Sequence, residues 1–133
     1  MKTVMAQGTF DVLHPGHIHY LENSKELGDN LVVVVARDSR NEDRGLYFDE
    51  DERKEMLNAL EVVDEAILGS EGDIYATVKD VDPDVITIGQ DQSHSVEEVK
   101  ELAEKATDHK VEVERISKKE EYSSSDIKSN KID

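Results

Sequence analysis

Two kinds of apolar pattern alternate along the chain. Short apolar runs, typical of buried parallel strands, alternate with longer stretches in which apolar residues recur every three or four positions, as on the buried face of a helix. The strand-like runs are residues 4–6, 31–36, 65–68 and 85–88, followed by the alternating, edge-like run 111–114. The helix-like stretches are residues 16–27, 49–60, 74–81 and 96–106. Five strands separated by helices predict a single Rossmann-like, doubly wound α/β domain with a five-stranded parallel sheet over residues 1–133.

Three expectations concern the ends of these elements. Gly28 follows the first helical stretch, where glycine commonly ends a helix, so we expect it to be the C-cap. Residues 40–49 are polar and contain one glycine, which predicts a mobile loop. A short C-terminal helix is expected to begin near Ser125, with serine as its cap. Because ligands of such sheets bind beyond the carboxyl ends of the strands, we expect the functional site among residues 8–17, 36–49 and 89–94.

The segment between the first strand and the first helix carries the most specific chemistry. It reads Gly8-Thr9-Phe10-Asp11-Val12-Leu13-His14-Pro15-Gly16-His17. Gly8 allows a ligand to approach the backbone closely, and Gly16 leaves the start of the helix bare, where N–H groups and the helix dipole favour an anion. His14 and His17 are three residues apart on that first turn, so both rings can face the same phosphate. The segment predicts a phosphate cradle with two imidazole donors.

Residues 8–11 together with 14–17 resemble the signature of the cytidylyltransferase-like nucleotidyltransferases. Further segments resemble that family in the same order, so the resemblance covers nearly the whole chain. They are Glu52-Arg53 with Met56-Leu57 for the helix after the mobile loop, residues 63–66 for the third strand, and residues 84–92 for the glycine-x-aspartate segment. The resemblance implies an enzyme that joins a nucleoside monophosphate to a phosphate-bearing acceptor and releases pyrophosphate. The implied reaction is a direct in-line displacement at the α-phosphate.

The same resemblance implies roles for individual residues. His14 and His17 are the implied catalytic residues, which bind triphosphate oxygens and stabilise charge in the transition state by position and electrostatics. The implied nucleotide-binding residues are Thr9, Phe10, His14, Pro15, Gly16, His17, Asp91 and Tyr122. The chain offers no carboxylate cage for a metal, so the implied divalent ion, Mg²⁺, is expected to bind mainly phosphate and water.

Within the family, three segments resemble the archaeal FAD synthases more than the bacterial cytidylyltransferases. They are residues 36–38, 89–92 and 122–127. This resemblance implies transfer of AMP from ATP to FMN, giving FAD and pyrophosphate. A glycerol-3-phosphate cytidylyltransferase that makes CDP-glycerol and a non-catalytic nucleotide-binding regulator are the alternatives. The flavin ring is expected against aliphatic side chains or against Tyr47 and Phe48, because the chain has no tryptophan.

The basic residues near the expected site are few. The predicted loop offers only Arg40 and Arg44, and the helix after it offers Arg53. Whether these arginines contact the triphosphate is open at this stage, because Arg53 could instead pair with acidic residues of its own helix.

Charge and composition narrow the possible partners. The 133 residues include 32 acidic and 16 basic side chains, a formal net charge of −16. Such a chain repels nucleic acid and anionic membranes, which leaves small molecules, ATP and FMN, and a possible homodimer. Acidic residues occupy the outward positions of ordinary amphipathic helices, which favours a folded, halophilic protein over a disordered acidic chain. Without cysteine, a leader-like start or a membrane-length apolar run, the protein is expected to be cytoplasmic.

Overall fold

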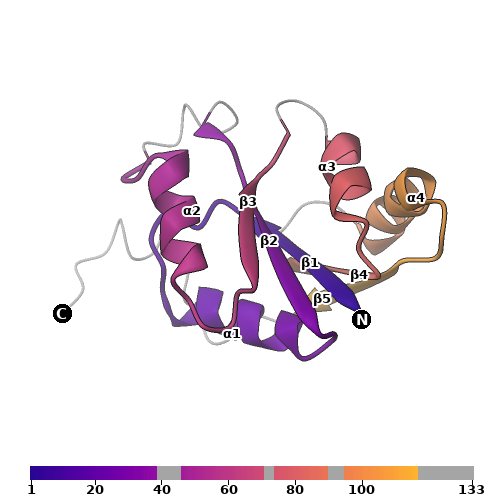
Figure 1. Cartoon of the computed structure of the whole chain (residues 1–133), viewed down its shortest axis with the longest axis horizontal. Helices are drawn as coiled ribbons and strands as arrows, with labels where there is room; N and C mark the ends of the chain where they lie inside the picture. The colour runs from indigo at the N-terminus through magenta and orange to yellow at the C-terminus, as the bar shows by residue number, and fades with distance from the viewer. Residues whose placement is uncertain (39–45, 71–73, 90–94, 117–133) are drawn as a thin grey trace.

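The sheet is the centre of the fold, and all of its strands are parallel (Figure 1). The computed structural model describes residues 1–38, 46–70, 74–89 and 95–116. The strands are β1 (Thr3–Gly8), β2 (Asn30–Val35), β3 (Glu65–Leu68), β4 (Val85–Gly89) and β5 (Glu112–Ile116), in the spatial order β3-β2-β1-β4-β5. This arrangement confirms the predicted five-stranded parallel α/β fold, with β5 at an edge. The single-domain organisation over the whole chain stays a prediction.

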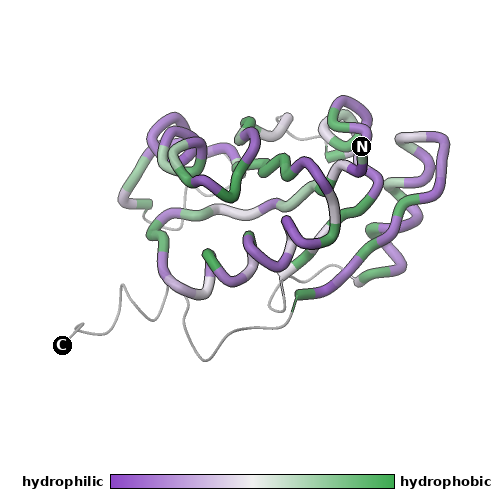
Figure 2. Tube along the Cα trace, turned by 60° about the horizontal axis from the view of Figure 1, so that its bottom comes forward, coloured by the Kyte–Doolittle hydropathy of each residue, from purple (hydrophilic) through white to green (hydrophobic). Residues whose placement is uncertain are grey.

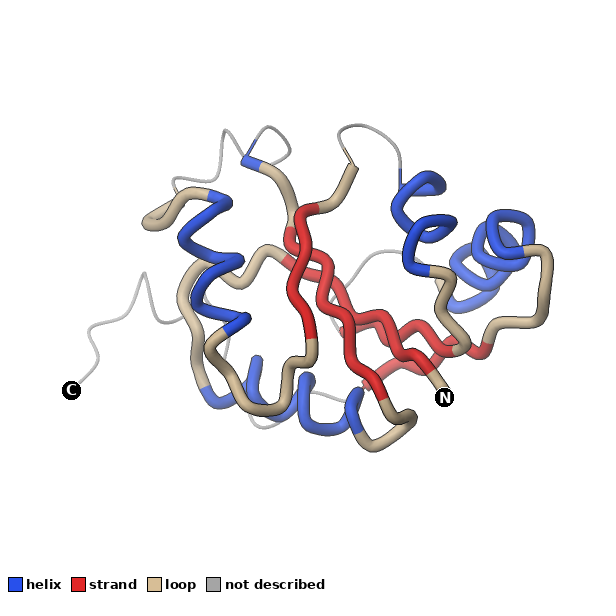
Figure 3. Tube along the Cα trace, in the orientation of Figure 1, coloured by secondary structure: helices blue, strands red, loops and turns tan. Residues whose placement is uncertain are grey.

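The helices form a layer on each face of the sheet (Figures 1 and 3). They are α1 (Pro15–Lys25), α2 (Glu50–Asn58), α3 (Ile74–Val81) and α4 (Val96–Thr107). Helices α1 and α2 cover one face, and α3 and α4 cover the other. None of the helices in the described ranges is both long and apolar enough to cross a membrane.

Successive residues of β1 are buried in different cores, because side chains of a strand alternate between the two faces of the sheet. Val4 and Ala6 lie in the core beneath α1 and α2, whereas Met5 lies in the core beneath α3 and α4. Both faces of the central strands are therefore apolar, as the continuous runs of the sequence indicate. Figure 2 shows hydrophobic and hydrophilic positions alternating along the helices. Each helix has buried residues that face the sheet.

The strand order creates a switch point between β1 and β4. From β1 the chain moves outward through β2 to β3, and then returns to place β4 on the other side of β1. At such a reversal the connections leave the two strands toward opposite faces, which opens a crevice beyond their carboxyl ends. Gly8 ends β1 there and Gly89 ends β4, so the histidine segment begins at the crevice. Residues 90–94 lie outside the described residues.

The expectation that Gly28 caps the first helix is wrong. Helix α1 ends at Lys25, and its C-cap is Glu26 in the ordinary right-handed conformation. Glycine is needed at position 28 for a different reason: a Cβ atom there would lie 2.7 Å from the Lys2 carbonyl oxygen and 2.7 Å from Val4 Cγ2. Close packing of this turn against β1, and not helix termination, therefore accounts for the residue.

Part of the predicted mobile loop has fixed contacts. Residues 46–49 are described, and Asp49 is the N-cap of α2 in a reciprocal capping box with Glu52. The backbone N–H groups of Tyr47 and Phe48 donate to Asp11, so hydrogen bonds connect this end of the loop to the histidine segment. The other residues of the predicted loop, 40–45, and the helix expected near Ser125 lie outside the described residues.

Candidate active site

His14 occupies the N-cap of α1, directly at the switch point. Its backbone is extended, with φ −145° and ψ 171°, and its carbonyl accepts from the N–H groups of His17 (2.9 Å) and Ile18 (3.2 Å). Its Nδ1 accepts from the Gly16 N–H at 3.0 Å, while Pro15 at the first helical position needs no acceptor. Because Nδ1 accepts a hydrogen bond, the proton of the neutral ring lies on Nε2. His14 therefore presents one donor, Nε2–H, and the Gly16 N–H serves to hold the ring.

The structure brings the two expected catalytic histidines together. The rings of His14 and His17 are stacked, with centroids 3.9 Å apart and planes at 21°. The Phe10 ring meets the His17 ring edge-on at 5.3 Å and also lies 6.4 Å from the Tyr20 ring. The two imidazoles therefore lie side by side at the start of α1, as their spacing predicts, and Phe10 packs against the His17 ring.

His17 is uncharged at neutral pH. Burial, and next the neighbouring His14, lower the pKa of His17 from 6.5 to about 4, although a backbone hydrogen bond with Val12 acts in the opposite direction. Burial has this effect because a low-dielectric environment disfavours the charged form of a base. At pH 7 the His17 ring is thus uncharged.

Phe10 supports His17 through a strained backbone. Its φ is +53°, in the left-handed region, and its side chain is buried. A Cβ atom on Gly8 would lie 2.9 Å from the Phe10 ring, so the glycine is required for this ring to fold back over the end of β1. The Phe10 side chain is buried and packs against His17 and Tyr20. The nucleotide contact expected of Phe10 from the sequence stays a prediction.

Asp11 ties the histidine segment to the start of α2. Its carboxylate is 2% exposed and accepts from the backbone N–H groups of Tyr47 and Phe48, with each N···O distance 3.0 Å. A carboxylate that accepts several backbone N–H groups is stabilised in its charged form. Sequence analysis assigned no such role to Asp11, because its partners are 36 and 37 residues away along the chain.

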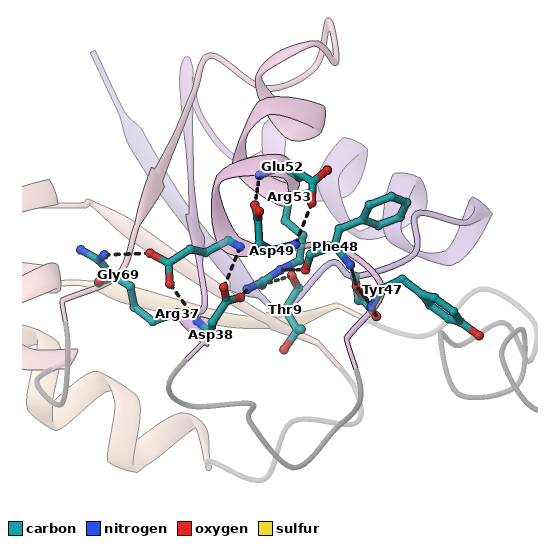
Figure 4. A network of polar contacts seen from close by, with 11 residues as sticks. Thr9, Arg37, Asp38, Tyr47, Phe48, Asp49, Glu52, Arg53 and Gly69 are labelled. Carbon is teal, nitrogen blue, oxygen red and sulfur yellow. Dashed lines mark hydrogen bonds and ion pairs between the residues drawn. The ribbon is translucent and has the colours of Figure 1, made fainter.

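Arg53 connects three further segments around the site (Figure 4). Its side chain is fully buried, with 0% exposure, although it lies on the surface helix α2. The guanidinium donates from Nη1 to the Thr9 carbonyl (2.8 Å), from Nε to the Phe48 carbonyl (3.2 Å) and from Nη2 to Asp38 Oδ1 (2.6 Å). Each of the three Arg53 nitrogens donates to an acceptor of the protein, and contact between Arg53 and the triphosphate stays an open question.

Asp38 and Glu50 extend these contacts to the ends of β2 and β3. The second Asp38 oxygen accepts from the Glu50 N–H at 3.2 Å, and the Glu50 carboxylate accepts from the Asp38 N–H and from Arg37 Nη1, both at 3.0 Å. Arg37 Nε also donates to the Gly69 carbonyl at 2.6 Å. We call Thr9, Arg37, Asp38, Phe48, Glu50 and Arg53 the Arg53 network. It fixes the loop after β1 relative to β2 and α2.

The remaining expected site residues are only partly described. Asp91 and Tyr122 lie outside the described residues, as do Arg40 and Arg44. Over the described ranges, no group of three or more histidine, aspartate or glutamate side chains is placed to hold a metal ion.

Comparison with known proteins agrees with this geometry. The family described as Cytidylyltransferase-like matches residues 5–132. The chain belongs to the cytidylyltransferase-like family. The FAD synthase of Thermoplasma volcanium is 60% identical over 94 residues, which are 69% of this chain and 66% of that protein. The FAD synthase of Aciduliprofundum boonei is 46% identical over 129 residues, 96% of this chain and 84% of that protein.

Among solved structures, a similar fold occurs in a chain described as the lipopolysaccharide core biosynthesis protein of Thermoplasma volcanium. The TM-score is 0.85 at 52% sequence identity, and the match covers 90% of this chain and 99% of that chain. The resemblance drawn from the histidine segment is thus confirmed at the level of the family.

Proposed function

We propose that this chain is an FAD synthase, which transfers AMP from ATP to FMN and releases pyrophosphate. The observation that carries the proposal is the stacked pair His14 and His17 on the first turn of α1, at the switch point of a cytidylyltransferase-like sheet. The acceptor is chosen from relatives named FAD synthase, which are 46–60% identical to this chain.

In the proposed reaction, an oxygen of the FMN phosphate attacks the α-phosphorus of ATP. The bond between that phosphorus and the bridging oxygen to the β-phosphate breaks, and pyrophosphate leaves with the bonding electrons. No covalent bond to the protein is needed. The protein's task is to hold the reacting groups in line and to stabilise the charge that develops on the phosphoryl oxygens.

His14 and His17 provide the donors for that charge. The hydrogen bond from Gly16 to His14 Nδ1 leaves Nε2 as the His14 donor atom of the proposal. His17 is neutral at pH 7, because burial lowers its pKa to about 4. One preorganised donor to a developing oxyanion contributes about 3 kcal/mol to transition-state stabilisation. Nucleotide contacts by Thr9, Phe10, Pro15, Gly16, Asp91 and Tyr122 form part of the same proposal.

A divalent ion, proposed to be Mg²⁺, completes the substrate. The described residues lack a cluster of protein ligands for it, so the ion would be held by the triphosphate and by water. When bound, it would neutralise part of the phosphate charge. We further propose that the nucleotide is ATP, that the protein is cytoplasmic and that it forms a homodimer. The net charge of −16 supports the proposal that the protein is halophilic.

The test is a reaction matrix analysed by chromatography. ATP or CTP is combined with FMN or glycerol 3-phosphate, with Mg²⁺ in concentrated KCl, and His17→Ala is the matched control. We expect FAD and pyrophosphate from ATP with FMN, and a strongly reduced yield from the variant. CDP-glycerol as the only product would establish the cytidylyltransferase alternative, and nucleotide binding without any pyrophosphate release would establish a regulator.

A further inference from the structure

Two aromatic residues are exposed on a backbone that is fixed from both sides. Tyr47 is 65% exposed and Phe48 is 37% exposed. Their N–H groups donate to Asp11, and the Phe48 carbonyl accepts from Arg53. Figure 4 shows both rings pointing away from the Arg53 guanidinium. The two rings are therefore presented outward by a preorganised segment.

Phe48 does not form the hydrophobic contact that is usual at its position before a helix. Asp49 is the N-cap of α2, so Phe48 is at the position that often packs against an apolar residue four positions into the helix. That residue is Arg53, whose guanidinium instead binds the Phe48 carbonyl. The contacts that hold Tyr47 and Phe48 to Asp11 involve backbone N–H groups, which any residue other than proline supplies. A hydrophobic contact with the start of α2 therefore does not explain the aromatic character of Phe48.

The segment is connected directly to the proposed site. Asp11 lies three residues before His14, in the loop that leads from β1 into α1. By binding the Tyr47 N–H, it fixes the aromatic segment relative to the paired imidazoles. Among the described residues, the other exposed large hydrophobic side chains are Met1, Ile74 and Tyr75, and the latter two belong to α3 on the opposite face of the sheet.

We propose that Tyr47, flanked by Phe48, is the surface on which the isoalloxazine ring of the acceptor FMN stacks. This inference rests on the proposed function and adds the residues that select a flavin over a small phosphorylated alcohol. A planar aromatic ring fits an exposed tyrosine held on a rigid backbone, because stacking then requires little ordering on binding. Glycerol 3-phosphate offers no such ring and gains nothing from this surface.

The experiment measures FMN binding and turnover in Tyr47→Ala, Tyr47→Phe and the matched control Tyr75→Ala. Tyr75 is also an exposed tyrosine, at 41%, but it lies on α3 and its hydroxyl donates to the Lys105 carbonyl. FMN affinity is read from the quenching of flavin fluorescence without ATP, and the KM values for FMN and ATP are measured separately. Sedimentation equilibrium gives the mass of each variant.

We expect Tyr47→Ala to weaken FMN binding about tenfold and to reduce the quenching, with the KM for ATP unchanged. Tyr47→Phe should retain binding, since the ring remains, and Tyr75→Ala should match the unmodified protein. If the unmodified protein makes FAD but Tyr47→Ala binds FMN normally, the stacking inference alone is overturned. A halved mass in Tyr47→Ala would identify the surface as a contact between copies and overturn it too. If the unmodified protein neither binds nor adenylates FMN, the proposed function fails with it.

Discussion

Replacing Arg53 with methionine should destabilise the protein by about 3 kcal/mol. The guanidinium is fully buried and donates to one carboxylate and two carbonyl groups, while methionine keeps an unbranched side chain without any donor. Removal of one partner of a buried ion pair costs about 3–5 kcal/mol. The low end applies because Asp38 is 43% exposed, so water can solvate the carboxylate that remains. In a domain of this size, such a loss lowers the melting temperature by about 10 °C.

The partner substitution, Asp38→Asn, tests the same pair from the other side. It leaves a positive charge at 0% exposure with only carbonyl acceptors, so we expect a loss of about 2–3 kcal/mol although the altered residue is far more exposed. The double variant should lose little more than Arg53→Met alone, because the second change then removes a carboxylate that is already solvated. Urea and thermal unfolding of the four proteins complete a double-mutant cycle. Losses that add within about 0.5 kcal/mol would refute the reasoning.

Activity should fall beyond what unfolding explains. Arg53 holds the Thr9 carbonyl next to the histidine segment, and a displacement of about 1 Å in such a site reduces turnover about 100-fold. The assay is kcat/KM for FAD formation well below the melting temperature of the variant. Lys54→Met is the matched control, since it removes the same charge from the neighbouring position of α2, outside the Arg53 network. Equal activity of folded Arg53→Met and Lys54→Met would contradict a positioning role for Arg53.

Four further predictions concern His17 and the surface charge. His17→Ala should lower kcat about 100-fold while changing ATP affinity much less, and equal losses in both would exclude a transition-state role. By NMR, His17 should titrate near pH 4, and nucleotide should raise this pKa; a midpoint near 6.5 without nucleotide would contradict its burial. Because unfolded chains take up this proton below about pH 6.5 and the native protein does so only near pH 4, the contribution of His17 to stability is full above 6.5 and is lost as pH falls through that window. The melting temperature should rise with KCl, since repulsion within a net charge of −16 is screened over about 3 Å at 1 M salt; a constant value would reject the halophilic interpretation.

The features that sequence analysis predicted correctly have local causes. Strand and helix positions follow from periodicity, and the pairing of His14 with His17 follows from their spacing on one helical turn. The features that it missed depend on distant segments. Gly28 is required by the approach of Lys2, and Arg53 is buried by acceptors at positions 9, 38 and 48.

One sequence signal for Arg53 exists but conflicts with the usual rule. Arg53 and Leu57 are both buried and are four residues apart, so they share the inner face of α2. Apolar periodicity predicts the inner face of a helix from hydrophobic residues alone, and arginine is left out because a charged side chain is rarely buried without a partner. The partner, Asp38, follows β2, so the sequence of α2 gives no indication of it. Asp91 and Tyr122, beyond the described residues, stay predictions.

The charge of the site raises the question of what attracts a triphosphate to so acidic a chain. The two arginines of the Arg53 network, Arg37 and Arg53, are matched by Glu50 and Asp38, so the network has no net charge. His17 is neutral at pH 7, and the N–H groups at the start of α1 contribute only partial positive charge. In the described part of the site, the proposed function therefore depends on hydrogen-bond donors at fixed positions and not on a net positive charge of the protein. Under the proposed function, a divalent ion carried with the triphosphate would neutralise the phosphate charge and salt would screen the acidic surface, so we expect activity to depend on both.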